Sequence, residues 1–510
     1  MKVSVVDLGF NSVKLVNYYV KKNNSYNAYE QQSVKVKLGE KLNETGRIGR
    51  ESIQRTINSL KLFRDIVDFK SIKNVLPVAT SAVREANNQK EFLNEVYEET
   101  GFRFRVLSGK EEALYSYVGA LRSTCIPTAL FFDLGGGSLE IVYTENFKIK
   151  KLMSLPLGAL RLSLAYGRND GSFTKKNYFK MKTHLLKLLP SRKELDMSVD
   201  TTIVGVGGTL RAMARYDQQI RSYMLNKIHN YRMDHESIDL INRRLYKMTP
   251  NDIAKIDAIG NNRAETIVAG ACIINMLMRK LAFGSVVISA RGLREGILSG
   301  FLESPKTYYT KNVNQDQMQN SVIVSCKQDI VENPTYTSIK PLIFVGLIKE
   351  REYEMIVHAM KQLSELPSTT NLYNMFYMII DEDNAHLNHS EQLVLALSII
   401  YTRKAKTANS LFARYESMLQ PKNRKSIEKI AACIGLLEIL GRNKSKVELT
   451  VLNQRKIVMN IIPGKKNPIP LMLLENMLKN FEVIFDVSID YSISNYNIRK
   501  QPIRQLLEQR

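Results

Sequence analysis

The chain has 510 residues, of which 44% are hydrophobic and 24% are charged, and it carries a formal net charge of +23. A chain of this length is too long to fold around a single hydrophobic core, so we expect roughly three or four domains. No apolar run reaches the roughly 18 residues that indicate a membrane span. Asp7 and Asn11 interrupt the first apolar stretch, which argues against a signal peptide. We therefore expect a cytoplasmic protein without a membrane partner.

The positive charge is concentrated in the first 309 residues, which hold 47 basic and 30 acidic side chains. Such an excess favours a polyanionic partner and speeds its capture at low salt. Nucleic acid is the usual polyanion, but we find no zinc finger, RNP aromatic pattern or basic-region helix and do not expect it as the partner. A solvated basic surface is the alternative. The cysteines form no CxxC pair, which predicts reduced thiols and no zinc site at Cys125, Cys272, Cys326 and Cys433.

Residues 128–144 read TALFFDLGGGSLEIVYT and predict two strands joined by a tight, glycine-rich turn. Three consecutive glycines allow a backbone to approach a ligand closely and to direct its N–H groups toward phosphate oxygens. Asp133 and Glu140 flank the turn, as a metal ion or an attacking water beside a phosphate would require. The turn opens into a strand, whereas P-loop and Rossmann loops open into a helix. An ordinary glycine-rich hairpin is the alternative interpretation.

Residues 3–20 repeat this pattern of strand, turn and strand. The motifs Asp7-Leu-Gly-x-x-Ser-x-x-Leu-Val and Asp133-Leu-Gly-x-x-Ser-x-x-Ile-Val coincide position for position. Two such hairpins predict a duplicated α/β domain that clamps a phosphate between its halves, each of which offers one carboxylate and one hydroxyl-bearing turn. The arrangement resembles the actin, Hsp70 and sugar-kinase superfamily.

Two further stretches carry polar side chains near the start of a predicted helix. Thr80, Ser81 and Arg84 follow a predicted strand, and a hydroxyl pair with an arginine can grip a phosphate. A helix N-cap with a solvent-facing arginine explains them equally well. Glu111 and Glu112 open the next helix, where acids usually serve the helix dipole and the cap.

The rest of the chain divides into regions that differ in composition and hydrophobic pattern. Residues 201–208 (TTIVGVGG) predict a strand that runs into a helix, whose first amides could bind an anion, with Thr209 at the N-cap position. The polar stretch at residues 302–320 predicts a linker. Residues 321–442 have a helical pattern, and strands around one helix are expected from residue 446 onward.

Eight segments over roughly the first 300 residues resemble, in the same order, those of the exopolyphosphatase / guanosine pentaphosphate phosphohydrolase family. They are DLGFNSVKLV, ATSAVREANNQKEF, LSGKEEA, FFDLGGGSLEIV, SLPLGALRL, GVGGTLRAMA, NNRAETIVAG and SARGLREGIL. The resemblance implies an α/β fold with a duplicated actin-like (ribonuclease H-like) two-lobed catalytic core and the active site in its cleft. A helical HD-like domain and a small α/β C-terminal domain would follow. The implied bounds are residues 1–120 for lobe I, 121–305 for lobe II, 320–443 for the HD-like domain and 446–510 for the C-terminal domain.

The resemblance also implies site residues. The family's Ser-Gly-x-Glu-Glu-Ala motif assigns the water-activating base to Glu112, and a one-residue slip leaves Glu111 as the alternative. A cofactor, Mg²⁺ or another divalent cation, would lie beside the acids Asp133, Glu140 and Asp7. The implied phosphate-binding residues are Asn11, Ser12, Arg84, Gly135, Gly136, Gly137, Ser138, Gly207, Gly208 and Thr209.

Some positions depart from the family's pattern. Phe10 stands where relatives usually carry Ser, and Lys14 replaces a common Arg, so the first turn would narrow the cleft or change which phosphate is held. The helical domain resembles HD phosphohydrolases but contains no His-Asp dipeptide, so we expect no metal site there. His358 is interpreted as a remnant, His386 and His389 as surface residues, and the domain as a scaffold for a homodimer or for guiding the substrate chain.

The implied function is an exopolyphosphatase that releases orthophosphate from the end of inorganic polyphosphate, a substrate that suits the basic excess. The alternative is hydrolysis of guanosine pentaphosphate to the tetraphosphate, although no base-binding residue is evident. A non-hydrolytic polyphosphate or nucleotide sensor belongs to another class, and the intact acids Glu112, Asp133 and Glu140 argue against it. A phosphotransferase would need an adenosine site.

Overall fold

The computed structural model describes residues 1–22, 24–168, 170–305, 337–365, 370–383, 387–442, 445–453, 455–464 and 469–494. They form two compact units, one reaching residue 305 and the other containing nearly all described residues from 337 onward. Most of the linker predicted at residues 302–320, Cys326, His386 and residues 495–510 lie outside the described residues. No helix in the described ranges has the length and apolar character needed to cross a bilayer.

A five-stranded sheet with the order β3-β2-β1-β4-β5 forms the first half of the first unit, which we call lobe I. Its strands are β1 (Lys2–Leu8), β2 (Ser12–Val20), β3 (Tyr26–Lys35), β4 (Asn74–Ala79) and β5 (Arg105–Val106). Strands β1, β2 and β3 are antiparallel, and β4 and β5 run parallel to β1. Central strand β1 is apolar on both faces: Val3 and Val5 enter one core, and Val6 and Leu8 enter the other, following the two-residue period of a strand.

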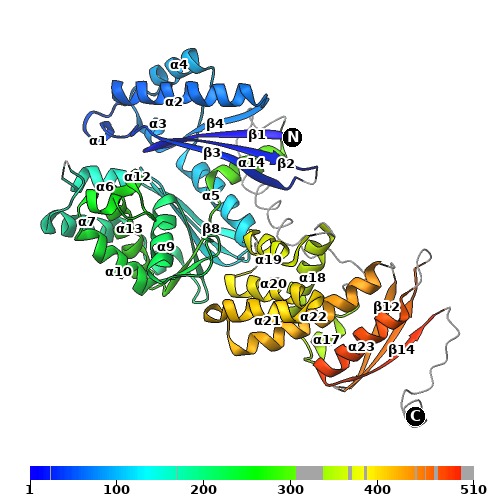
Figure 1. Cartoon of the computed structure of the whole chain (residues 1–510). Coiled ribbons are helices and arrows are strands. Elements are labelled where there is room, and N and C mark those ends of the chain that lie inside the picture. The colour runs from blue at the N-terminus through cyan, green and yellow to red at the C-terminus, as the bar shows by residue number, and fades with distance from the viewer. Residues whose placement is uncertain are drawn as a thin grey trace, which may run out of the picture. The chain divides into compact units, whose positions relative to one another are not determined.

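Helices cover both faces of this sheet (Figure 1). Those of lobe I are α1 (Leu42–Thr45), α2 (Arg50–Phe69), α3 (Ser81–Glu85) and α4 (Gln89–Thr100). Phe63 of α2 and Phe92 of α4 pack in the core that contains Val6. The other face is covered by α5 (Gly109–Thr124) and α14 (Leu293–Glu303). These two helices approach so closely that a Cβ on Gly119 would overlap the carbonyl of Gly292.

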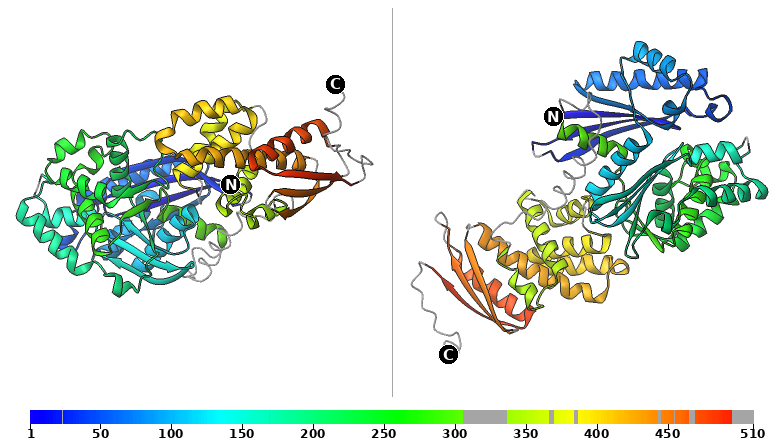
Figure 2. Two further views of the ribbon diagram at one scale, coloured as in Figure 1. Left: turned by 90° about the horizontal axis from the view of Figure 1, so that it is seen from below. Right: turned by 180° about the vertical axis from the view of Figure 1, so that it is seen from behind.

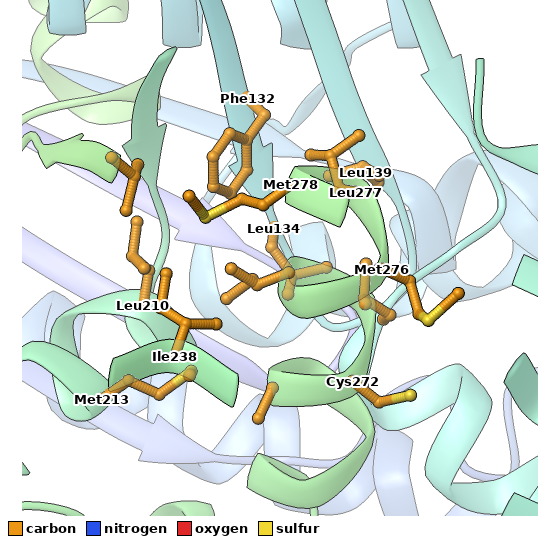
Figure 3. Close-up of a cluster of buried hydrophobic side chains, with 14 of the residues drawn as sticks. Phe132, Leu134, Leu139, Leu210, Met213, Ile238, Cys272, Met276, Leu277 and Met278 are labelled. Carbon is orange, nitrogen blue, oxygen red and sulfur yellow. The ribbon is translucent and has the colours of Figure 1, made fainter. Parts of the chain in front are cut away.

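A six-stranded sheet with the order β10-β11-β9-β6-β7-β8 forms the second half, lobe II. Its strands are β6 (Ala129–Leu134), β7 (Leu139–Glu145), β8 (Lys148–Leu155), β9 (Thr202–Val206), β10 (Arg232–Asp234) and β11 (Ser285–Ile288). Its helices are α6 (Ala159–Tyr166), α7 (Lys175–Leu188), α8 (Arg192–Leu195), α9 (Gly208–Ile220), α10 (His235–Tyr246), α11 (Pro250–Ala254), α12 (Asn261–Ala264) and α13 (Ile267–Lys280). Helix α13 is almost entirely buried, and its side chains, among them Leu277 and Met278, pack with Phe132 of β6 (Figure 3).

The two lobes repeat one topology. The order β8-β7-β6-β9-β11 in lobe II corresponds to β3-β2-β1-β4-β5 in lobe I, with three antiparallel strands followed by two parallel ones. Helices α5 and α14 lie between the two sheets, because a single core contains Val5 of β1, Phe131 of β6 and Leu121 of α5. The prediction of a duplicated α/β core is confirmed.

The second unit is helical and then turns to a small sheet. Its helices are α17 (Pro341–Phe344), α18 (Glu350–Glu365), α19 (Leu372–Asp381), α20 (His389–Arg403), α21 (Ala405–Arg414), the 3₁₀ helix η1 (Glu416–Met418) and α22 (Pro421–Arg442). The strands β12 (Lys446–Asn453), β13 (Lys456–Ile462) and β14 (Ser488–Ile493) form one sheet with α23 (Leu471–Phe485) beside it (Figure 2).

One histidine of this unit differs from its prediction. His389, expected at the surface, is only 4% exposed at the start of α20. The side chain of Asn388 accepts a hydrogen bond from the Glu391 amide and so caps the helix. This cap makes His389 the first helical residue and not part of a polar loop. The expectation of an exposed His389 was wrong.

Candidate functional site

A cavity of about 140 Å³ lies where the two lobes meet. The turns that follow β1 and β6, the segments that follow β4 and β9, and the beginning of α5 all contribute to its wall. Asp7 of β1 and Asp133 of β6 both line it, so the two predicted hairpins face one space. Ligands of open α/β sheets bind at the carboxyl ends of parallel strands, which is where this cavity lies.

The two hairpin turns have the same internal hydrogen bond. In the first turn the Gly9 amide donates to the Ser12 carbonyl at 3.1 Å, and in the second the Gly135 amide donates to the Ser138 carbonyl at 3.0 Å. The turns also touch: a Cβ on Gly136 would lie 3.2 Å from that of Asn11. We call them turn 1 (residues 9–12) and turn 2 (residues 135–138).

The carbonyls of the three glycines of turn 2 bond to the start of α6. Gly135 O accepts from the Ala159 amide (3.0 Å), Gly136 O from the Leu160 amide (2.9 Å) and Gly137 O from Arg161 Nε (2.7 Å). Because a trans peptide is planar, each carbonyl fixes the following N–H in the opposite direction. The N–H groups of residues 136–138 therefore point away from α6, and none of them has an acceptor within the described chain. Together they form a set of donors suited to phosphate oxygens.

Glu112 begins α5 and faces the cavity with 8% of its surface exposed. Arg84 Nη1 donates to its carboxylate at 2.9 Å and to the Leu107 carbonyl at 2.8 Å, which fixes the position of both charged groups. Burial raises the pKa of Glu112 to about 7; the Arg84 charge opposes the rise, and the charges of Asp133 and Asp7 add to it. A carboxyl group with this pKa can accept a proton near neutral pH.

The neighbouring Glu111 has a different position. Its carboxylate accepts hydrogen bonds from the Ser108 amide (2.9 Å) and hydroxyl (2.8 Å), forming a capping box for α5, and it also pairs with Arg105. Glu111 is not among the residues that line the cavity. The bonds from Ser108 and Arg105 hold its pKa below the usual value in spite of partial burial, which acts to raise it.

Two further predicted acids lie side by side on neighbouring strands. Asp133 of β6 pairs in register with Glu140 of β7, and both line the cavity. Ser116 donates to Asp133, and Ser154 Oγ donates to Glu140 at 2.8 Å. Burial raises the pKa of both carboxyl groups; that of Glu140 lies well above its usual value, with the charges of Glu112 and Asp133 adding to the rise. A nearby cation would relieve this repulsion.

These carboxylates suit a cation that arrives with the substrate. No three His, Cys, Asp or Glu side chains of the described residues are close enough to form a ready-made metal site. Mg²⁺, however, is usually held by one or two carboxylates together with waters and substrate phosphates. Asp133 and Glu140 meet that requirement, and Asp7 lines the same cavity.

Four cations also line the cavity: Lys14, already noted as a departure from the family's pattern, and Arg211, Arg263 and Arg294, which the sequence did not place at the site. Burial lowers the pKa of Lys14 to about 8; Asp7 opposes that fall, and the three arginines add to it. Arg294 Nη1 is a buried donor without a hydrogen-bond partner within the described residues. An unpaired buried guanidinium donor beside a cavity indicates an anionic ligand.

The remaining predicted residues also lie at the cavity. Ser12, Gly207, Gly208 and Thr209 line it, whereas Arg84 reaches the site through Glu112. Gly207 has a φ of 110°, which favours glycine, and a Cβ on Gly208 would overlap the guanidinium of Arg263. The site thus joins two turns, a helix start, buried acids and buried cations.

Comparison with known proteins identifies the family. Residues 19–304, more than half of the chain, match the Ppx/GppA phosphatase family. The chain belongs to this family. Exopolyphosphatase 1 of Mycobacterium tuberculosis is 27% identical over 308 residues, covering 60% of this chain and 89% of that protein. A guanosine-5'-triphosphate,3'-diphosphate pyrophosphatase of Aliivibrio fischeri is 25% identical over 426 residues, covering 81% and 80%.

Two other matches show how much of each protein the similarity covers. A bifunctional 3-dehydroquinate synthase/phosphatase of Fusobacterium nucleatum is 29% identical over 311 residues, and the chain spans only 46% of that longer protein. The crystal structure of an exopolyphosphatase from Cytophaga hutchinsonii aligns with a TM-score of 0.55 at 22% identity, covering 59% of this chain and 98% of that one. This alignment supports the fold of the two-lobed core. The prediction of the family from eight short segments is confirmed.

The three arginines were not predicted, although each lies in a segment that carries the Ppx/GppA resemblance, as does Lys14 in DLGFNSVKLV. Arg211 lies in GVGGTLRAMA, Arg263 in NNRAETIVAG and Arg294 in SARGLREGIL. Each comes from a different helix or helix start of the core, namely α9, α12 and α14. Only the packing of these helices brings the three arginines to one cavity, and nothing in their local spacing indicates it.

Proposed function

We propose that the protein is an exopolyphosphatase, a Mg²⁺-dependent hydrolase that removes the terminal phosphate of inorganic polyphosphate as orthophosphate. The observation that carries the proposal is the position of Glu112. Its carboxylate, with a pKa of about 7, shares a cavity of about 140 Å³ with the amides of turn 2 and with buried cations. The Mycobacterium relative named exopolyphosphatase supports this substrate class.

In the proposed mechanism Glu112 is the general base. It takes a proton from a water molecule whose oxygen forms a bond to the terminal phosphorus, while the bond from that phosphorus to the bridging oxygen breaks. Arg84 holds the Glu112 carboxylate through the 2.9 Å contact. A positioned base of this kind contributes about 10²–10⁴ in rate. Glu111 is committed to the helix cap, which favours Glu112 as the base.

The remaining groups hold the phosphate and balance its charge. The amides of residues 136–138 donate to the terminal phosphate, and Lys14, Arg211, Arg263 and Arg294 offset the negative charge of the chain end and of the leaving oxygen. Asp133 and Glu140, with Asp7 nearby, are the residues that would hold a divalent cation. Bound there, the cation would stabilise phosphate oxygens that gain charge.

Guanosine pentaphosphate is the second candidate substrate. The Aliivibrio relative is named for a guanosine nucleotide and aligns with 81% of this chain, which favours this candidate over other nucleotides. A cavity of about 140 Å³ is similar in size to the ~150 Å³ cavities that hold one benzene molecule. This interior accommodates phosphate groups, and it would serve either substrate.

A paired assay tests the proposal. Purified protein with Mg²⁺ is incubated with inorganic polyphosphate and, separately, with guanosine pentaphosphate, and orthophosphate release is measured. We expect release from polyphosphate, with no fragments of intermediate length produced by internal cleavage. Release from guanosine pentaphosphate alone would favour the second candidate. Release from neither, with polyphosphate still bound, would replace the hydrolase by a non-hydrolytic binding protein.

We also infer that the helical part of the second unit is an HD-like scaffold without a metal site, which serves a homodimer or guides the substrate chain. Light scattering on the full chain tests the dimer, and a monomeric mass at micromolar concentration would contradict it.

A further inference from the structure

Arg161 of α6 contacts both turn 2 and lobe I without lining the cavity. Its Nε donates to the Gly137 carbonyl at 2.7 Å. Its Nη2 donates to Glu85 at 2.7 Å, and its Nη1 donates to Asn43 Oδ1 at 3.3 Å. Glu85 is the last residue of α3 and Asn43 lies in α1, and both helices belong to lobe I. One guanidinium thus connects the phosphate-facing turn of lobe II to two elements of lobe I.

Phe10 of turn 1 supports this arrangement. The Arg161 guanidinium lies 5.0 Å from the centre of the Phe10 ring, and the ring is only 2% exposed. A Cβ on Gly137 would overlap the ring, so ring and turn 2 are in direct contact. The ring also shares the lobe I core with Leu160, a residue of lobe II. The stacked ring restricts where the guanidinium can lie.

The bond to Gly137 fixes the orientation of one catalytically placed amide. The carbonyl of Gly137 and the N–H of Ser138 belong to one planar peptide, so holding the first toward Arg161 holds the second toward the cavity. Gly137, on one side of this peptide, offers little resistance to its rotation, because glycine has no Cβ to restrict it. Without Arg161 the peptide would be free to turn its N–H away from the phosphate.

We propose that Arg161 is a positioning residue that ties the orientation of the turn 2 amides to the closing of the two lobes. When Glu85 and Asn43 approach, the guanidinium is held between them and Gly137, and the Ser138 amide points into the cavity. When the lobes separate, Arg161 loses its lobe I partners and the stacked ring, and the amide loses its fixed direction. The inference deepens the proposed phosphate hydrolysis and rests on it.

The test compares Arg161→Gln with matched controls. We expect kcat on polyphosphate to fall on the order of 10²-fold, as for the loss of one oriented amide donor. The affinity for tripolyphosphate, measured by calorimetry, should fall only about tenfold, as for one hydrogen bond to a charged group. The midpoint of the pH profile should not move, because Glu112 keeps its partners. Glu85→Gln alone should lower kcat about tenfold. Added to Arg161→Gln, it should lower kcat little further.

Two control variants separate this role from simpler ones. Arg47→Gln removes an exposed ion pair to Glu91 of the same 2.7 Å length, and we expect wild-type kinetics. Glu265→Gln breaks the pairs that join Lys35 and Lys37 of lobe I to lobe II without touching turn 2, and we expect less than about a threefold change in kcat. If Glu265→Gln lowers kcat as much as Arg161→Gln does, the loss comes from weaker lobe closure alone, and the proposal that Arg161 orients the turn 2 amides is overturned.

The remaining outcomes each decide the inference. If Arg161→Gln matches Arg47→Gln in both kcat and tripolyphosphate affinity while the wild type is active, the inference is wrong and the proposed function stands. If the wild type releases no phosphate, the proposed function fails, and the calorimetric comparison alone decides the orienting role. Should Arg161→Gln not fold, as judged by circular dichroism, Glu85→Gln decides it, and unchanged kcat and affinity in that variant would contradict it.

Discussion

Turn 1 and turn 2 share one scaffold but carry different chemistry. In both, the strand brings an aspartate to the cavity and the same internal hydrogen bond closes the turn. Asp133 faces Glu140 across its strand pair, whereas Asp7 faces Lys14 at the corresponding place. Turn 2 exposes amides through its glycines, whereas turn 1 has Phe10 and Asn11 in their place. The duplicated fold thus supplies an acid-rich, amide-rich half and a half that supplies a cation and an aromatic wall.

The paired charges of the two hairpins are complementary. In the hairpin of turn 2 the paired acids repel a phosphate that the free amides attract. Burial already raises the pKa values of Glu140 and Asp133. In the other hairpin Lys14 occupies the place of Glu140, so Asp7 faces a cation and not a fourth acid. The proposed base, Glu112, comes from α5, which lies between the sheets, so it belongs to neither turn.

The largest expected effect on activity comes from replacing Glu112, which lies in neither turn. Glu112→Gln keeps the shape of the side chain and removes the base, so we expect kcat on polyphosphate to fall by about 10²–10⁴. Polyphosphate binding, measured by calorimetry, should change little. Glu111→Gln is the matched control: it weakens the α5 cap and should lower the melting temperature while leaving kcat within about threefold. A larger kcat loss in Glu111→Gln than in Glu112→Gln would reverse the assignment.

Exchanging the paired charges tests the comparison directly. Glu140→Lys gives turn 2 the charge of turn 1, and we expect at least roughly a 10²-fold loss of Mg²⁺-dependent activity because a cation-holding acid becomes a competing cation. Lys14→Glu gives turn 1 the charge of turn 2 and should mainly raise KM for polyphosphate, by about tenfold, through the loss of a cation beside the phosphate. Steady-state kinetics over a Mg²⁺ titration measure both. Equal effects on kcat and KM in the two variants would refute the division of roles.

A smaller effect is expected where the two turns touch. A Cβ at Gly137 would overlap the Phe10 ring and approach Ser81 Oγ, so Gly137→Ala should cost about 1–3 kcal/mol of stability and lower activity about tenfold. Phe10→Leu replaces the ring by a smaller aliphatic side chain and should restore some of the stability in the double variant. Thermal melts of the four proteins measure this coupling, and strictly additive changes would show that the turns do not press on each other.

The sequence predicts the parts of this site that local spacing determines. The two hairpins, their aspartates and Glu140 follow from motifs of ten residues, and the duplicated sheets follow from the hairpins. The choice between Glu111 and Glu112 depends on which of them closes the capping box with Ser108, a single-residue register that the motif leaves open. The positions of Arg211, Arg263 and Arg294 and the Arg161 contact depend on packing between elements distant in the chain, for which one sequence offers no local signal.

His389 illustrates the same limit in the second unit. It was expected at the surface, but the Asn388 cap begins α20 at this residue. Burial there follows from the contacts of α20 and not from its own residue type.

The pH dependence of kcat/KM on polyphosphate tests the central claim most directly, because it reports the ionisation of the base in the free enzyme. Burial raises the pKa of Glu112 to about 7, so the carboxylate that must accept a proton is increasingly protonated below that pH. We predict that kcat/KM falls about tenfold per pH unit below a midpoint near 7 and that this dependence disappears in Glu112→Gln. A wild-type profile that stays level from pH 5 to 8, or the same midpoint in Glu112→Gln, would contradict the account.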